Sequence, residues 1–179
     1  MVIFHKRVAG ANQDWLDGFL VRAKRAVGLR GAVTVLVTSD REMRALNGRF
    51  RGQDQPTDVL SFPAEVVAKR RFTGEVAISA EIAARNARRL GHSTAEEVKI
   101  LTLHGILHLA GYDHEADRGE MARREMQLRK KLGLPVGLIE RTDRTPPADL
   151  SPTGKPPASR RKAAARSARA PRSRARRAP

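Results

Sequence analysis

Three histidines lie close together in the run His104-Gly-Ile-Leu-His108-Leu-Ala-Gly-Tyr-Asp-His114. Since the chain has no cysteine, a tightly held transition metal would need His, Asp or Glu ligands. His104 and His108 are four residues apart, so on a helix their rings project from one face and can bind the same ion. A sharp turn at Gly111 can bring His114 back as a third ligand.

Three imidazoles with a fourth position open to water are typical of a catalytic zinc site, where the pKa of the bound water falls toward ~7. Imidazole also suits nickel, copper and iron. A single histidine in a helix is ordinarily a surface residue or a satisfied core residue. Two at ligand spacing on an apolar helix favour a metal site, because a buried imidazole without a partner costs free energy. We therefore predict one zinc ion per chain, held by His104, His108 and His114.

The same spacing is similar to the metzincin protease signature, His-Glu-x-x-His-x-x-Gly-x-x-His. Gly111 and His114 fall where that signature requires them, but Gly105 occupies the position of the glutamate that acts as general base. The sequence therefore predicts the metal geometry without the chemistry of that class of peptidase.

Strand-like and helix-like patterns surround the histidine run. Ser39 and Ser93 each begin a capping box, and Gly91, Gly111 and Gly133 each follow a helical pattern. The patterns predict strands at residues 2–8, 32–38, 58–62 and 73–79, and helices at residues 13–27, 39–48, 80–90, 93–110 and 115–132. We expect an α+β fold: a single small domain with a mixed β-sheet packed by helices, and the metal site on a helix and the turn after it.

The composition changes at Arg144. Residues 144–179 hold eleven Lys or Arg and one acid, seven of the ten prolines, and none of the aromatic residues. Such a segment cannot offset the entropy of ordering itself, so we predict a domain at 1–143 and a disordered basic tail at 144–179. The tail could be a solvated appendage, or it could add salt-dependent affinity for RNA.

The net charge of +16 favours a polyanionic partner, either nucleic acid or an anionic membrane surface. No stretch approaches the ~20 apolar residues of a membrane span, and the N-terminus does not resemble a secretory signal. These features predict a cytoplasmic protein that does not enter a membrane. The oligomeric state is left open.

The histidine run resembles the signature of the YbeY family, bacterial endoribonucleases and rRNA maturation factors. Two further segments agree with that family in order and spacing: Leu46-Asn47 with Arg51 and Pro56-Thr-Asp-Val-Leu-Ser-Phe-Pro63, and Gly74-Glu-Val-Ala-Ile78, where the family more often has Asp at position 75. The resemblance covers about residues 2–140. It implies three histidine ligands, a functional Arg51, a small α+β fold, and cleavage of single-stranded RNA in rRNA maturation and ribosome assembly or quality control.

Several residues near these motifs allow two interpretations. Arg51 could bind phosphoryl oxygens through paired hydrogen bonds, or it could be a solvated charge like Arg49; the resemblance favours the first. Thr57 and Asp58 could line a cleft or cap the start of a strand. Asp113 could orient an imidazole or shape the turn.

Together these observations predict a zinc-dependent endoribonuclease that acts on rRNA or a ribosomal subunit and needs no small-molecule cofactor. The alternative is a non-catalytic, RNA-binding ribosome-assembly factor in which the metal is structural. The nucleophile could be water or the 2′-hydroxyl of the RNA.

Overall fold

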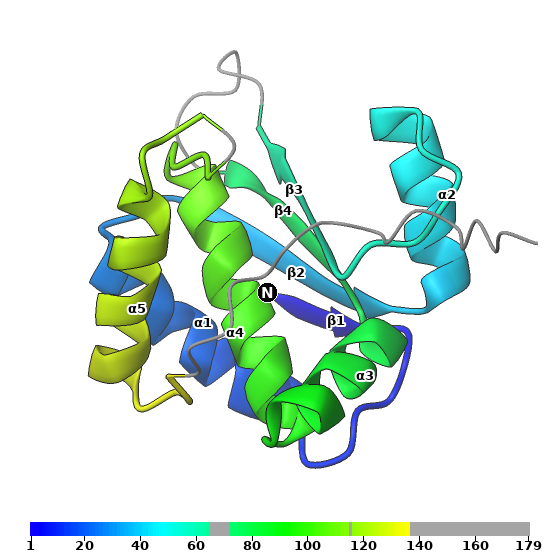
Figure 1. Ribbon diagram of the computed structural model, residues 1–179, viewed down its shortest axis with the longest axis horizontal. Coiled ribbons are helices and arrows are strands. Elements are labelled where there is room, and N and C mark those ends of the chain that lie inside the picture. Colours follow the sequence, from blue (N-terminus) through cyan, green and yellow to red (C-terminus); the bar gives the residue numbers. More distant parts are fainter. Residues whose placement is uncertain (65–71, 115, 137–179) are drawn as a thin grey trace, which may run out of the picture. The chain divides into compact units, whose positions relative to one another are not determined.

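The computed structural model of the chain describes residues 1–64, 72–114 and 116–136 (Figure 1). Its elements are β1 (Val2–Phe4), α1 (Gln13–Val27), β2 (Ala32–Thr38), α2 (Asp40–Arg51), β3 (Val59–Pro63), β4 (Phe72–Ser79), α3 (Ala80–Leu90), α4 (Thr94–Leu109) and α5 (Glu120–Leu132). The strand order is β1-β2-β4-β3. β1, β2 and β4 are parallel, and β3 pairs antiparallel with β4 at one edge. The expected α+β fold with a mixed sheet is confirmed.

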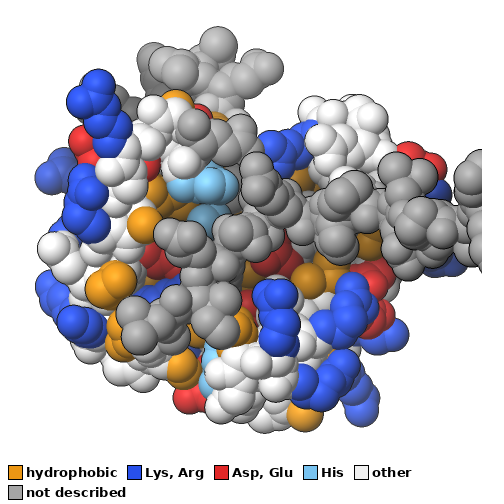
Figure 2. Space-filling model, in the orientation of Figure 1, with side chains coloured by type: hydrophobic (Ala, Val, Ile, Leu, Met, Phe, Trp, Pro, Cys, Tyr) orange, Lys and Arg blue, Asp and Glu red, His pale blue; other side chains and the backbone are white. Residues whose placement is uncertain are grey.

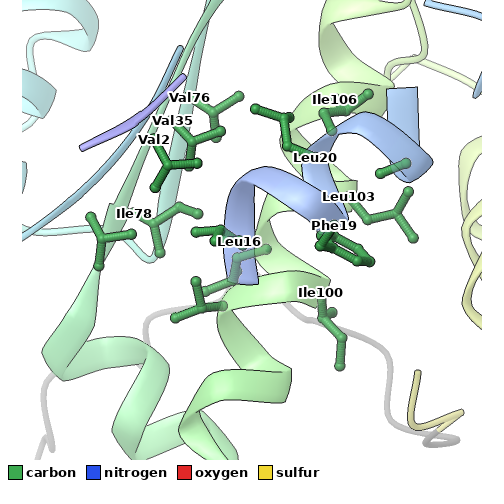
Figure 3. Close-up of a cluster of buried hydrophobic side chains, with 14 of the residues drawn as sticks. Val2, Leu16, Phe19, Leu20, Val35, Val76, Ile78, Ile100, Leu103 and Ile106 are labelled. Carbon is green, nitrogen blue, oxygen red and sulfur yellow. The ribbon is translucent and has the colours of Figure 1, made fainter. Parts of the chain in front are cut away.

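The two faces of the sheet pack against different helices. On β4, Val76 and Ile78 belong to the main core together with side chains of α1, α3, α4 and α5, and alternation directs Ala77 to the opposite face. There Ala77 packs with Leu60 and with Met43 of α2. Figure 3 shows part of the main core, with Val2, Leu16, Phe19, Leu20, Val35, Val76, Ile78, Ile100, Leu103 and Ile106 labelled.

β1 and α2 end at residues other than those predicted. β1 ends at Phe4 rather than Val8, because its register with β2 covers only Val2–Phe4 and the next two amides both donate to the Val37 carbonyl. α2 begins as expected, with the Ser39 hydroxyl accepting from an amide of the first turn. It continues past Gly48 to Arg51, so Arg51 lies in the last turn of a helix rather than in a loop.

α5 begins at Glu120, five residues later than predicted at Glu115. Asp117 explains the start, because its carboxylate accepts from the amides of Gly119, Glu120 and Met121 at 2.7–3.1 Å. These bonds hold the pKa of Asp117 below its usual range.

Among the described residues, no helix is long and apolar enough to cross a membrane. The predicted tail, residues 144–179, and the predicted domain boundary at 143 lie outside the described residues.

Candidate metal centre

The three histidines of the predicted site converge at the C-terminal end of α4. Their ligand nitrogens all lie within 4.8 Å of one another, so the three imidazoles could hold one metal ion. His104 Nε2 and His108 Nε2 are 3.2 Å apart. Two nitrogens on a tetrahedral zinc ion at ~2.0–2.1 Å would be separated by about 3.3–3.4 Å. The donor set and its spacing therefore fit a zinc ion, and histidine side chains reach the surface here (Figure 2).

A tight turn after α4 delivers the third histidine. The amide of Gly111 donates to the carbonyl of His108 at 2.9 Å, and the amide of Tyr112 donates to that of Leu107 at 3.1 Å. Gly111 has φ +91°, and a Cβ there would meet no atom, so its backbone conformation rather than space favours glycine. Tyr112 packs against the main core and anchors the turn that carries His114. The predicted sharp turn at Gly111 is confirmed.

Gly105, between the two histidines of α4, lies against the sheet. A Cβ at this position would lie 2.6 Å from Val76 Cγ1 and 3.1 Å from the Ser61 hydroxyl oxygen. The Ser61 hydroxyl donates to the carbonyl of Gly105 at 3.3 Å. A glutamate at position 105 would therefore collide with β4, which gives a steric reason for the missing peptidase base.

A carboxylate from α5 fixes the orientation of His104. Glu125 is 8% exposed, and its Oε2 lies 2.9 Å from His104 Nδ1. An ionised carboxylate can only accept, so Nδ1 carries the proton and Nε2 keeps its lone pair for a metal. The other oxygen of Glu125 accepts from Arg129 Nε at 2.9 Å. Arg129 thus positions the carboxylate of Glu125, which in turn positions the imidazole of His104.

Glu125 was not predicted from the sequence, in which Asp113 was the candidate for this role. A signal was present, because Glu125 lies between Met121 and Leu128 on the buried face of α5, where a charge needs a partner. Asp113 is exposed, and its backbone carbonyl accepts from the amides of residues 116 and 117, so it shapes the turn.

The electrostatics at the site favour neutral imidazole. Burial lowers the pKa of His108 below its usual value, and the neighbouring His104 and His114 lower it further. Asp113 and a hydrogen bond to the backbone of Tyr112 act in the opposite direction and raise this pKa. A neutral imidazole is the form that binds a metal, so protons compete less for His108 than for a solvated histidine.

Arg51 lies at the same end of the sheet as the histidines. It is exposed in the last turn of α2, and Figure 1 shows the C-terminal ends of α2 and α4 both at the upper end of the view, with β3 and β4 between them. The loop after Arg51 is fixed by buried Asn47, whose Nδ2 donates to the carbonyl of Gln55 at 2.7 Å.

The remaining motif residues have structural contacts. Asp58 Oδ1 accepts from the amide of Val59 at 2.8 Å and lies 3.4 Å from the Thr57 hydroxyl, an arrangement that caps the start of β3. Glu75 is exposed and, by alternation along β4, points to the same face as Ala77, away from α4.

Comparison with known proteins agrees with the family resemblance of the motifs. The family model "Endoribonuclease YbeY" matches residues 4–133. A similar protein from Koribacter versatilis, named endoribonuclease YbeY, is 56% identical over 79% of this chain and 91% of its own length. Another protein of that name, from Solibacter usitatus, is 44% identical over 78% of this chain and 92% of its own length. The solution structure of TM1509 from Thermotoga maritima matches with a TM-score of 0.52 and 32% identity, covering 74% of this chain and 89% of that one. The chain therefore belongs to the endoribonuclease YbeY family.

Proposed function

We propose that this chain is a zinc-dependent endoribonuclease that cleaves single-stranded regions of ribosomal RNA in the cytoplasm, during rRNA maturation and ribosome assembly or quality control. Family membership supports the endoribonuclease activity. The observation that carries the metal dependence is the convergence of His104, His108 and His114 within 4.8 Å. The net charge of +16 supports a polyanionic substrate.

In the proposed mechanism, the three histidines hold the ion and the chain's other groups position the substrate around it. A bound zinc ion would polarise a phosphoryl oxygen and lower the pKa of water. Glu125 keeps the proton of His104 on Nδ1, away from the metal side. Arg51 donates hydrogen bonds to phosphoryl oxygens and so offsets the negative charge that develops during cleavage.

The test incubates metal-loaded protein with single-stranded and with base-paired RNA, and compares wild type with His108→Ala and Arg51→Ala. We expect wild type to cut the single-stranded RNA preferentially. His108→Ala should lose both bound metal and cleavage. Arg51→Ala should lose cleavage by about 100-fold or more while it keeps its metal content and melting temperature, since the side chain is exposed.

Arg41→Ala is the matched control, because Arg41 is also an exposed arginine of α2 but lies in the first turn. It should cleave like wild type. Cleavage that survives in Arg51→Ala would remove Arg51 from the mechanism. A wild-type protein that binds RNA and metal but cuts no RNA would favour the non-catalytic assembly factor.

A further inference from the structure

An exposed phenylalanine lies beside Arg51, and the packing of the domain does not account for its exposure. Phe50 is 56% exposed and is the one aromatic residue among the large exposed hydrophobic side chains that the structure describes. The guanidinium carbon of Arg49 lies 5.2 Å from the centre of its ring. The residues 49–51 therefore combine an aromatic ring with two exposed arginines.

The orientation of Phe50 follows from the packing of α2. Met43, Asn47 and Phe50 recur at helical spacing on the face toward the sheet, and the first two are buried. Phe50 extends this stripe toward β3, where its ring meets that of Phe62 edge to face, with centroids 4.9 Å apart. The edge contact holds the ring in place and leaves more than half of the residue open to solvent.

β3 connects this ring to the metal helix. Phe62 faces α2, while its neighbour Ser61 faces the other way and donates to the carbonyl of Gly105 on α4 at 3.3 Å. Adjacent residues of one edge strand therefore contact both helices, so Phe50 lies across β3 from the helix that carries His104 and His108. A strand of RNA whose phosphate lay at the metal centre could extend toward this ring.

We propose that Phe50, with Arg49 beside it, is a stacking platform for an unpaired base of the RNA substrate, next to the phosphate contact of Arg51. This proposal rests on the proposed function, because it takes RNA as the ligand. Every base offers a flat π-face to an aromatic ring, and flanking arginines neutralise the backbone of the same strand. A paired base is stacked within its helix, so the platform would favour single strands.

The test measures binding rather than cleavage, and uses the full-length, metal-loaded protein. The probes are a fluorescent 2′-O-methyl phosphorothioate oligoadenylate, which resists hydrolysis, and an abasic oligomer with the same number of phosphates. Wild type should bind the base-bearing probe more tightly than the abasic probe by on the order of 5- to 150-fold, the range that corresponds to ~1–3 kcal/mol for one stacked base.

Phe50→Ala and Phe50→Leu should bring the ratio of the two affinities close to one, and Phe50→Trp should restore it. Leucine keeps an apolar contact with Phe62 but offers no ring, so it separates stacking from folding. The slope of log affinity against log salt should not change in these variants, because no phosphate contact is removed. Val21→Ala is the matched control, since Val21 is 59% exposed on α1.

An affinity ratio that Phe50→Ala and Phe50→Leu leave unchanged would overturn the proposal and point to a protein partner for this patch. Cleavage of unmodified RNA by wild type is followed in parallel. If wild type cuts no RNA, the proposed function fails, while the ratio of affinities still decides whether Phe50 stacks on a base.

Discussion

Replacing Glu125 with glutamine would keep the volume of the side chain and remove one acceptor from the support of His104. Both carboxylate oxygens are engaged, Oε2 by His104 Nδ1 and Oε1 by Arg129, each at 2.9 Å. Glutamine has one acceptor oxygen and one NH₂ group, so it cannot accept from both donors. The substitution must therefore disturb one of the two contacts.

Each orientation of the amide has a different consequence. If its oxygen faces Arg129, its NH₂ faces His104 Nδ1, and the imidazole proton moves to Nε2, the nitrogen that lies 3.2 Å from His108 Nε2. If its oxygen faces His104, its NH₂ opposes the N–H groups of Arg129. Loss of such a supporting carboxylate typically weakens metal binding 10- to 100-fold, or about 1.4–2.7 kcal/mol. We expect that loss for Glu125→Gln.

The assay is a titration of the metal-free protein with zinc in competition with a chelator of known affinity. Glu120→Gln is the control, because Glu120 is exposed in the first turn of the same helix and should bind zinc like wild type. The melting temperature of each metal-free variant shows whether folding has changed. Unchanged zinc affinity in Glu125→Gln would refute the idea that this carboxylate sets the tautomer of His104.

Three further predictions concern stability. Gly105→Ala should lower the free energy of unfolding by about 1–3 kcal/mol in chemical denaturation, because the new methyl would lie 2.6 Å from Val76 Cγ1; unchanged stability would contradict the close packing. His92→Leu should lower it by roughly 3 kcal/mol, since His92 pairs at 2.7 Å with a Glu97 carboxylate that is 0% exposed. The metal-free protein should lose stability as pH falls below about 6.5, because burial depresses the folded-state pKa of His108 and the unfolded chain takes up the proton first. Melting temperatures measured with chelator across this range test the last point, and His108→Gln should flatten the curve.

Elements with strong local signals could be predicted from the sequence. The capping box of Ser93 and Glu96 forms in full, with both halves bonded at 2.9–3.1 Å, and the helix that it begins carries two histidines one turn apart. The predicted end of α2 at Gly48 was wrong, because a glycine inside a helix lowers the stability of the helix by only ~1 kcal/mol. The burial of Met43 and Asn47 in the helix supplies tertiary packing that a local reading of Gly48 does not contain.

In the candidate site, too, local patterns predicted some residues, and tertiary packing determined the others. Spacing alone indicated that His104, His108 and His114 could share an ion, because helix geometry and one glycine turn determine where they lie. The contact between Glu125 and His104 depends on how α5 packs against α4, because the two residues are twenty-one positions apart in the chain. The exposed position of the Phe50 ring likewise depends on its tertiary contact with Phe62, which the sequence around Phe50 does not contain.

The contact between Gly105 and β4 also limits which mutations can change this enzyme's chemistry. A codon change that introduced the peptidase glutamate at position 105 would drive its Cβ into Val76 and Ser61. A glutamate at this position would therefore be destabilising unless the sheet also changed, for example by a smaller side chain at position 76. Selection for stable folding therefore opposes the first step from this histidine site toward peptide hydrolysis, even though the three histidines have the spacing of a metzincin protease.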